Sequence, residues 1–186
     1  GVVGRNSGKV LDVIVRGSGS GSRLIISVTG GSYVGGIAGY TTLEISGGTF
    51  SVDPSDYLAD GCGVIEDGTS YVVAGVTELT EDTTFSGEVF GNFIVPAGSN
   101  ITITLDDATI TGLSTADVIH VENGATLTIV GTGTVSIPAN DTYSVIFNEG
   151  TTTLNGGTYV STSQSGYYVI SNHGVMEIND GVTVED

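Results

Sequence analysis

The chain has 186 residues, of which 13% are charged and 30 are glycine. This length allows one ordinary domain, or two small ones, with a buried core. The glycine content is about twice the usual 7%, but it falls far short of the one third that collagen requires. With 39% hydrophobic residues, the chain is also unlike a disordered protein. The composition therefore indicates an all-β protein with many turns.

The charge is distributed unevenly along the chain. Residues 24–186 carry 20 of the 21 acids and no Lys or Arg, and the four basic residues are Arg5, Lys9, Arg16 and Arg23. Nucleic acids need basic side chains against their phosphates, and anionic membranes and acidic polysaccharides need them for the same Coulombic reason. We therefore expect no nucleic-acid partner, and the charge disfavours anionic membranes and acidic polysaccharides.

Membrane and metal signatures are also missing from the sequence. No run of 18 apolar residues occurs, so we expect no membrane insertion by this segment. The many carboxylates could bind calcium weakly at the surface. Neither an EF-hand loop nor a Gly-Gly-x-Gly-x-Asp array is present, so we expect no cofactor and no specific metal site.

A repeat of about 24 residues runs through the C-terminal part of the chain. One row of apolar residues, Leu105, Ile129, Leu154 and Ile178, has steps of 24, 25 and 24 residues. A second row, Ile94, Ile119, Ile146 and Ile170, keeps nearly the same step. Apolar residues alternate within each unit, which indicates short strands, and turn residues follow them. This pattern predicts a right-handed parallel β-helix, or β-solenoid, whose stacked coils bury their inward side chains together.

The N-terminal part carries the same unit. Residues 37–50 match residues 146–159 without a gap, whereas residues 53–75 break the pattern. Within the break, residues 63–73 read as a hairpin on the turn Asp67-Gly68. We predict β-helix coils in residues 1–52, a hairpin or cap in residues 53–75, and a second stretch of coils in residues 76–186.

Several of these motifs resemble repeats of known surface proteins. Ser46-Gly47-Gly48-Thr49-Phe50 and Leu154-Asn155-Gly156-Gly157-Thr158-Tyr159 are similar to coil motifs of large parallel β-helix surface proteins of anaerobic Gram-positive bacteria. Residues 1–40, with Gly35-Gly36-Ile37-Ala38-Gly39-Tyr40, resemble the glycine-rich adhesion repeat called GLUG. The resemblance implies adhesion or surface display, and it specifies a fold better than a function. Phage tail spikes and fibres use similar coils.

Parallel β-helices include pectate lyases and polygalacturonases, so paired acids need attention. Asp106-Asp107 is the obvious pair for glycoside hydrolysis, but the repeat places it in a turn position, where Asp is favoured for local hydrogen bonding. Asn172-His173-Gly174 resembles the Gly-His-Gly of polygalacturonases, and it also aligns with a turn. Both enzyme classes use a basic residue, which residues 24–186 lack. We therefore predict no catalytic residues.

Other polar residues have structural explanations. His120 and Glu122 should both face outward, as a solvated pair, because Ile119 and Val121 take the inward positions. Asn148 and Asn172 are 24 residues apart, as are Asn155 and Asn179, which predicts ladders of stacked amides. Cys62 has no second cysteine with which to form a disulfide, and we interpret it as a small, half-buried hydrophobic residue.

Four tyrosines cluster in the last coils: Tyr143, Tyr159, Tyr167 and Tyr168. Tyr159 shares its position with Phe50, which favours an inward position for both. Tyr167 and Tyr168 are adjacent, so a strand would expose one of them. We predict this pair as the ligand-binding residues, with sugar rings stacking on the exposed ring.

The sequence as a whole favours a non-catalytic segment of an extracellular adhesin or stalk that contacts glycans or host surface proteins. The segment starts and stops within the repeat pattern, so we expect it to be attached to the cell surface through other parts of a longer protein. Two alternatives remain open. One is a carbohydrate-active enzyme of the β-helix class, and the other is a segment of a phage tail spike or fibre, which should form trimers.

Overall fold

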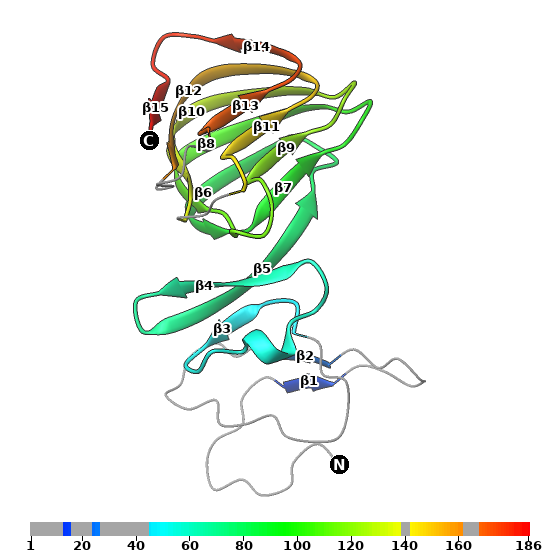
Figure 1. Ribbon diagram of the computed structural model, residues 1–186, viewed down its shortest axis with the longest axis vertical. Coiled ribbons are helices and arrows are strands. Elements are labelled where there is room, and N and C mark those ends of the chain that lie inside the picture. Colours follow the sequence, from blue (N-terminus) through cyan, green and yellow to red (C-terminus); the bar gives the residue numbers. More distant parts are fainter. Residues whose placement is uncertain (1–12, 16–23, 27–44, 139–141, 162–167) are drawn as a thin grey trace, which may run out of the picture. The chain divides into compact units, whose positions relative to one another are not determined.

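The computed structural model describes residues 13–15, 24–26, 45–138, 142–161 and 168–186 (Figure 1). This part of the protein is all-β, with a single 3₁₀ turn at Ser55–Tyr57. Two compact units divide after Gly75. The predicted GLUG-like repeat lies mostly outside the described residues. Its described parts are β1 (Val13–Val15) and β2 (Leu24–Ile26), which form an antiparallel pair.

A β-hairpin in the first unit consists of β4 (Cys62–Asp67) and the first part of β5 (Ser70–Glu78), whose last residues, from Val76 on, belong to the second unit. Its two-residue loop is Gly68-Thr69, because Asp67 pairs with Ser70, so the loop lies one residue after the predicted Asp67-Gly68 turn. Gly68 has a φ of 59°, a left-handed conformation that glycine adopts without strain. A small core of three buried residues, Ile45, Phe50 and Val73, packs within this unit.

The pairing of β3 (Gly48–Phe50) differs from the prediction of N-terminal coils. This strand pairs antiparallel with β5, through Gly48↔Val73 and Phe50↔Tyr71, whereas stacked coils pair parallel. The physical reason is the hairpin: β5 returns beside β3 in the opposite direction before the coils begin. Of the coil stretch predicted in residues 1–52, only this C-terminal end and the β1–β2 pair are described.

The second unit is a parallel β-solenoid, which confirms the predicted fold class (Figure 1). Each coil begins with a short strand, which is followed by one long strand or, in the last coil, by two short ones. Every strand pair in the unit is parallel. The last residues of β5 and then β6 (Thr83–Phe90) precede four coils. These coils comprise β7 (Asn92–Val95) with β8 (Asn100–Thr111), β9 (Ile119–Val121) with β10 (Thr126–Ile137), β11 (Ile146–Asn148) with β12 (Thr151–Ser161), and β13 (Ile170–Asn172) with β14 (Val175–Ile178) and β15 (Thr183–Glu185).

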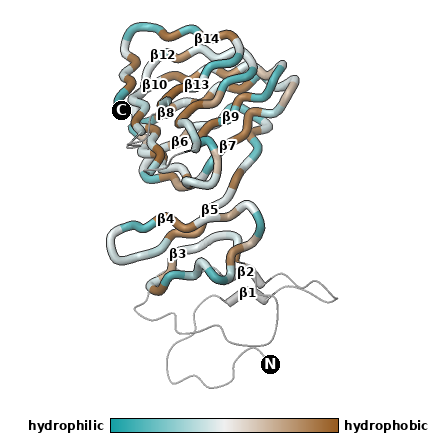
Figure 2. Tube along the Cα trace, viewed as in Figure 1, coloured by the Kyte–Doolittle hydropathy of each residue, from teal (hydrophilic) through white to brown (hydrophobic). Residues whose placement is uncertain are grey.

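Inward-facing residues stack in rows through the coils. Ile103, Ile129 and Leu154 pair in successive coils and are completely buried. Figure 2 shows hydrophobic residues recurring along the stacked strands. Parallel pairing brings the backbones of neighbouring coils to about 4.8 Å from each other. One coil could not cover these side chains alone, so the interior is stabilised only by the stack.

The register of the first complete coil differs from the sequence alignment. Ile103 pairs with Ile129, whereas the alignment assigned Leu105 to that row, so the prediction was wrong by two residues. Ile94 pairs with His120 and faces outward, and Phe93 takes the inward place beside Ile119. A slip of two residues keeps the face of the strand, whereas a slip of one residue reverses it.

A corner of the coil accounts for one of the two residues of the first slip. β8 contains one extra residue here, because Thr132 pairs with Asp106 and Gly133 with Ala108. The bulged residue, Asp107, has a φ of 52°, and Gly131 in β10 has a φ of 93°. Bulges with left-handed residues bend a strand, so each long strand can pass from one face of the coil to the next.

Candidate functional site

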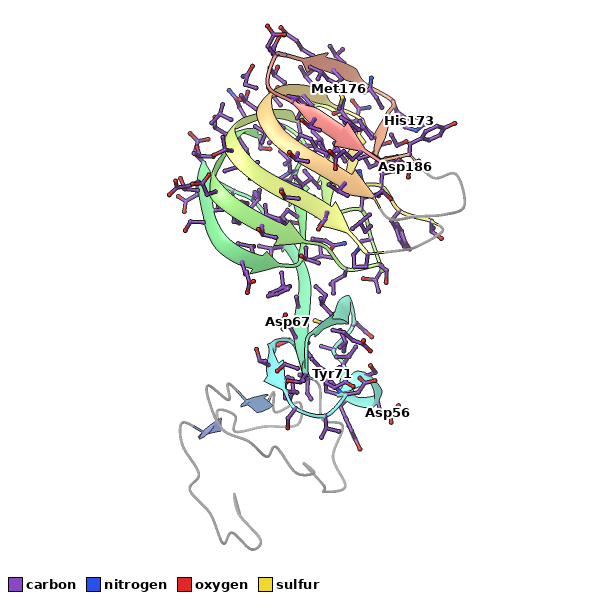
Figure 3. The ribbon with its side chains drawn as sticks, turned by 90° about the vertical axis from the view of Figure 1, so that its left-hand side faces the viewer. Asp56, Asp67, Tyr71, His173, Met176 and Asp186 are labelled. Carbon is purple, nitrogen blue, oxygen red and sulfur yellow. The ribbon has the colours of Figure 1, made fainter. Side chains whose placement is uncertain are left out.

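Tyr168 lies at the rim of an apolar groove in the last coil, and its neighbour Tyr167 lies outside the described residues. The side chain of Tyr168 is 73% exposed. The groove has a volume of about 710 Å³, and its walls include Met176, Ile178 and Val184. Met176 is labelled in Figure 3, in the coil that also carries His173 and Asp186.

The walls of the groove continue the interior rows of the solenoid. Ile178 pairs with Leu154, and Val184 pairs with Tyr159. The two partners in the preceding coil, Leu154 and Tyr159, are fully buried. Asn172 and Asp186 add an amide and a carboxylate to the lining. An exposed aromatic ring, apolar walls and a few polar groups can hold a sugar ring by stacking and hydrogen bonding.

Asp106 and Asp107 are held at the corner of the coil, as exposed residues of β8. The hydroxyl of Thr132 donates a hydrogen bond to Asp107 Oδ1 at 2.6 Å, from the next coil. Asp and Asn tolerate the left-handed conformation better than other residues with side chains. The two residues therefore lie at a bulge within β8 and not in the predicted turn, and Asp106 pairs with Thr132 and not with the residue that the alignment assigned to it.

His120 and Glu122 face outward from the coil, as predicted, but they do not form a pair with each other. Glu122 Oε2 accepts a hydrogen bond from the backbone N–H of Ala97, at 2.8 Å. His120 Nε2 lies 3.0 Å from Oε2 of Glu149, in the next coil. Glu149 was not predicted as a partner of His120, although the repeat contains the signal: Phe147 pairs with His120, and Glu149 lies two residues further on.

Asp117 is a partly buried carboxylate in the connection before β9. Its Oδ1 accepts a hydrogen bond from the backbone N–H of Ser144 at 2.7 Å. Burial raises the pKa of Asp117, and the bond from Ser144 and the nearby His120 offset part of that rise. This carboxylate thus joins two successive coils.

The predicted asparagine ladders are present. Asn148 Nδ2 donates to Asn172 Oδ1 at 2.7 Å, and Asn179 Nδ2 donates to Asn155 Oδ1 at 2.8 Å. Asn92 is a buried asparagine that the sequence analysis missed. Its side chain bonds Leu113 N, Leu113 O and Ala116 O. These amides connect the coils.

Three further predictions concern Tyr159, Cys62 and His173. Tyr159 is completely buried and donates to Gly156 O at 3.1 Å, and burial raises its pKa. Cys62 is half-buried and packs against the core of the first unit. His173 lies in a turn in which Gly174 N donates to Asn172 Oδ1, at 3.2 Å. The repeat predicted the positions of Tyr159 and His173, and the half-buried position of Cys62 agrees with its interpretation as a small hydrophobic residue.

Two structural findings concern metals and membranes. Among the described residues, no group of three or more His, Cys, Asp or Glu side chains is placed to hold a metal ion. No helix in the same part of the chain is long and apolar enough to cross a membrane.

Comparison with known proteins gives no family assignment. The chain matches no protein-family model, and it has no significant match among curated proteins or solved structures.

Proposed function

We propose that this chain is a non-catalytic segment of an extracellular adhesin or surface stalk. The observation that carries the proposal is the shared register of the coils. Inward rows such as Ile103–Ile129–Leu154 and the bonded asparagines join each coil to the next. A solenoid built in this way presents regular lateral faces formed by successive coils, which suits display and contact.

The proposed contacts are with glycans or host surface proteins, through the exposed ring of Tyr168 and its neighbour Tyr167. The groove beside Tyr168 supports this choice, because an aromatic rim and two polar side chains match the apolar face and the hydroxyl groups of a sugar. The net negative charge of the chain favours neutral over acidic glycans. Weak binding of calcium at surface carboxylates is part of the proposal.

The test is binding of the purified protein to a glycan array, with calcium and with a chelator. We expect binding to one class of neutral glycan, reduced about tenfold by Tyr168→Ala because an exposed aromatic anchor is lost. Tyr57→Ala is the matched control, since Tyr57 is 47% exposed in the first unit and lies outside the groove. Equal losses in the two variants would remove Tyr168 from the proposal.

The same array separates adhesion from catalysis. Mass spectrometry of the bound glycans should show chains of unchanged length. Shortened products would contradict the non-catalytic assignment and favour a β-helix carbohydrate-active enzyme. Binding to host-cell proteins without binding to glycans would restrict the proposed contact to proteins.

A further inference from the structure

Three aromatic rings form a column on the outer face of the solenoid, which we call the aromatic column: His120, Phe147 and His173. The centroid of Phe147 lies 5.1 Å from that of His120, with an edge-to-face arrangement, and 5.1 Å from that of His173, with a tilt of 39°. The three rings come from three successive coils. Parallel pairing places Phe147 beside His120 and beside Ser171. His173 follows Ser171 by two residues, in the turn after β13, and its ring reaches back to Phe147.

The aromatic column contains both histidines of the chain, and both contact the same phenylalanine. Phe147 is half-buried, so part of its ring remains open to solvent. Neither imidazole stacks flat on the phenyl ring, given interplanar angles of 87° and 39°. The column is therefore an aromatic surface with a solvent-facing part.

A carboxylate is fixed beside the column. Glu149 Oε2 lies 3.0 Å from His120 Nε2, and the side chain of Glu149 is 44% exposed. An ionised carboxylate can accept about four hydrogen bonds, so the contact with His120 leaves capacity for another donor. Because His120 already holds the carboxylate in place, an incoming partner would lose less conformational entropy in ordering it.

The charge around the column points to a cationic partner. Residues 24–186 contain no Lys or Arg, so this region cannot neutralise its own acids with either residue, and the chain carries a net charge of −17. Asp117 and Glu122 lie on the same coil as His120 and close to it in sequence. Glu78 pairs with Ile94, which in turn pairs with His120, so Glu78 lies on the same face of the solenoid. A cation is attracted to such a surface, whereas an anion is repelled.

We propose that the aromatic column and Glu149 bind an arginine side chain of a partner protein. A guanidinium is planar, so it can pack on the phenyl ring and donate to the carboxylate at the same time. A lysine ammonium is a compact, strongly hydrated charge and matches this pair less well. The site rests on the proposed adhesive function and specifies the chemistry of a protein contact distinct from the Tyr168 groove.

The test uses the full chain and two labelled peptides that differ only in having arginine or lysine in a Gly/Ser background. Binding is measured by fluorescence anisotropy at low and at high ionic strength. We expect the arginine peptide to bind more tightly than the lysine peptide. Glu149→Gln and Phe147→Leu should each weaken its binding about two- to fivefold, in line with exposed ion pairs and cation–π contacts.

Glu177→Gln is the matched control, because it removes one exposed carboxylate of the last coil by the same substitution. It should change arginine-peptide binding by less than about twofold, because it removes an exposed, screened charge that has no contact with the aromatic rings among the interactions described. Equal losses in Glu149→Gln and Glu177→Gln, or equal affinity for the two peptides, would overturn the site as non-specific attraction. Since Phe147 is half-buried, the Glu149 variant tests the site even if Phe147→Leu destabilises the fold.

Separate outcomes distinguish this site from the proposed function. If glycan binding is lost in Tyr168→Ala while Glu149→Gln leaves arginine binding unchanged, the adhesin proposal stands and the arginine site fails. If the arginine peptide binds as expected while neither glycans nor host cells are bound, the site stands and the adhesive function fails. Loss of glycan binding in Phe147→Leu without any effect on the arginine peptide would identify the column as a sugar contact and overturn the proposal.

Discussion

Asparagine side chains form hydrogen bonds between successive coils, both in the interior and at the surface of the solenoid. Asn148 is completely buried, and it bonds Asn172 and Val175 in the next coil and Thr152 on the following strand. A buried polar group that loses its partner costs about 1–3 kcal/mol. The amide thus stabilises the stack through several partners at once, whereas the exposed ladder of Asn155 and Asn179 has water as an alternative.

The first prediction compares these two ladders. Asn148→Ala should lower the free energy of unfolding by about 3 kcal/mol, because it leaves buried groups, among them the Thr152 hydroxyl, without their hydrogen-bond partner. Asn179→Ala should cost less than about 1 kcal/mol, since both Asn179 and Asn155 are exposed. Urea denaturation followed by circular dichroism measures both. Equal losses of unfolding free energy in the two variants would show that burial does not determine how much an asparagine pair contributes.

The residue scale is also where the sequence was most informative. The 24-residue spacing of Asn148 and Asn172 was sufficient to predict their contact, since parallel coils repeat their positions in register. Asn92 could not be found in the same way, because its partners are backbone groups of a connecting loop. Such a contact leaves no periodic signal in the sequence.

At the scale of the strand, alternation predicted the inward face of β8 but not its register, and in β7 it assigned Ile94 to the wrong face. Alternating apolar residues in β8 identify the inward face correctly, but they fit equally well at a shift of two residues. The bulge at Asp107 and the longer connections of the first coils make the step from Ile103 to Ile129 26 residues. Neither feature has an apolar signature, so the alignment assigned Leu105 to the wrong row. Tyr168 was predicted as a contact, and only the structure showed the groove beside it.

The corner of the coil gives the second prediction. A Cβ at Gly131 would overlap the carbonyl oxygen of Leu105 in the preceding coil, and its φ of 93° is unfavourable for residues with side chains. Gly131→Ala should therefore cost more than about 4 kcal/mol, or prevent the coils from stacking.

Gly87, at the same corner in β6, provides the control. It has a φ of 65°, but a Cβ there meets no atom within 4 Å. Gly87→Ala should cost only the left-handed strain, about 1–2 kcal/mol. Thermal unfolding of both variants checks the comparison, and similar losses would show that close approach of the coils does not constrain Gly131.

At the scale of the molecule, the two units have separate cores of very different size. Among the described residues, 21 buried side chains form the core of the solenoid, whereas three form that of the first unit. No residue belongs to both cores. Stability from burial increases with the apolar area removed from water, so we expect the solenoid core to contribute more stability than the described core of the first unit.

This difference predicts two unfolding transitions in denaturant, with the first unit unfolding before the solenoid. Phe50→Ala, in the small core, should shift only the early transition, and Ile129→Ala, in the solenoid core, should shift only the late one. Each substitution should cost about 3 kcal/mol within its own unit, because it leaves a cavity among buried neighbours. Hydrogen exchange followed by mass spectrometry assigns each transition to its residues. If Phe50→Ala and Ile129→Ala shifted one common transition equally, the two units would be unfolding as a single cooperative structure through β5, the strand that both share.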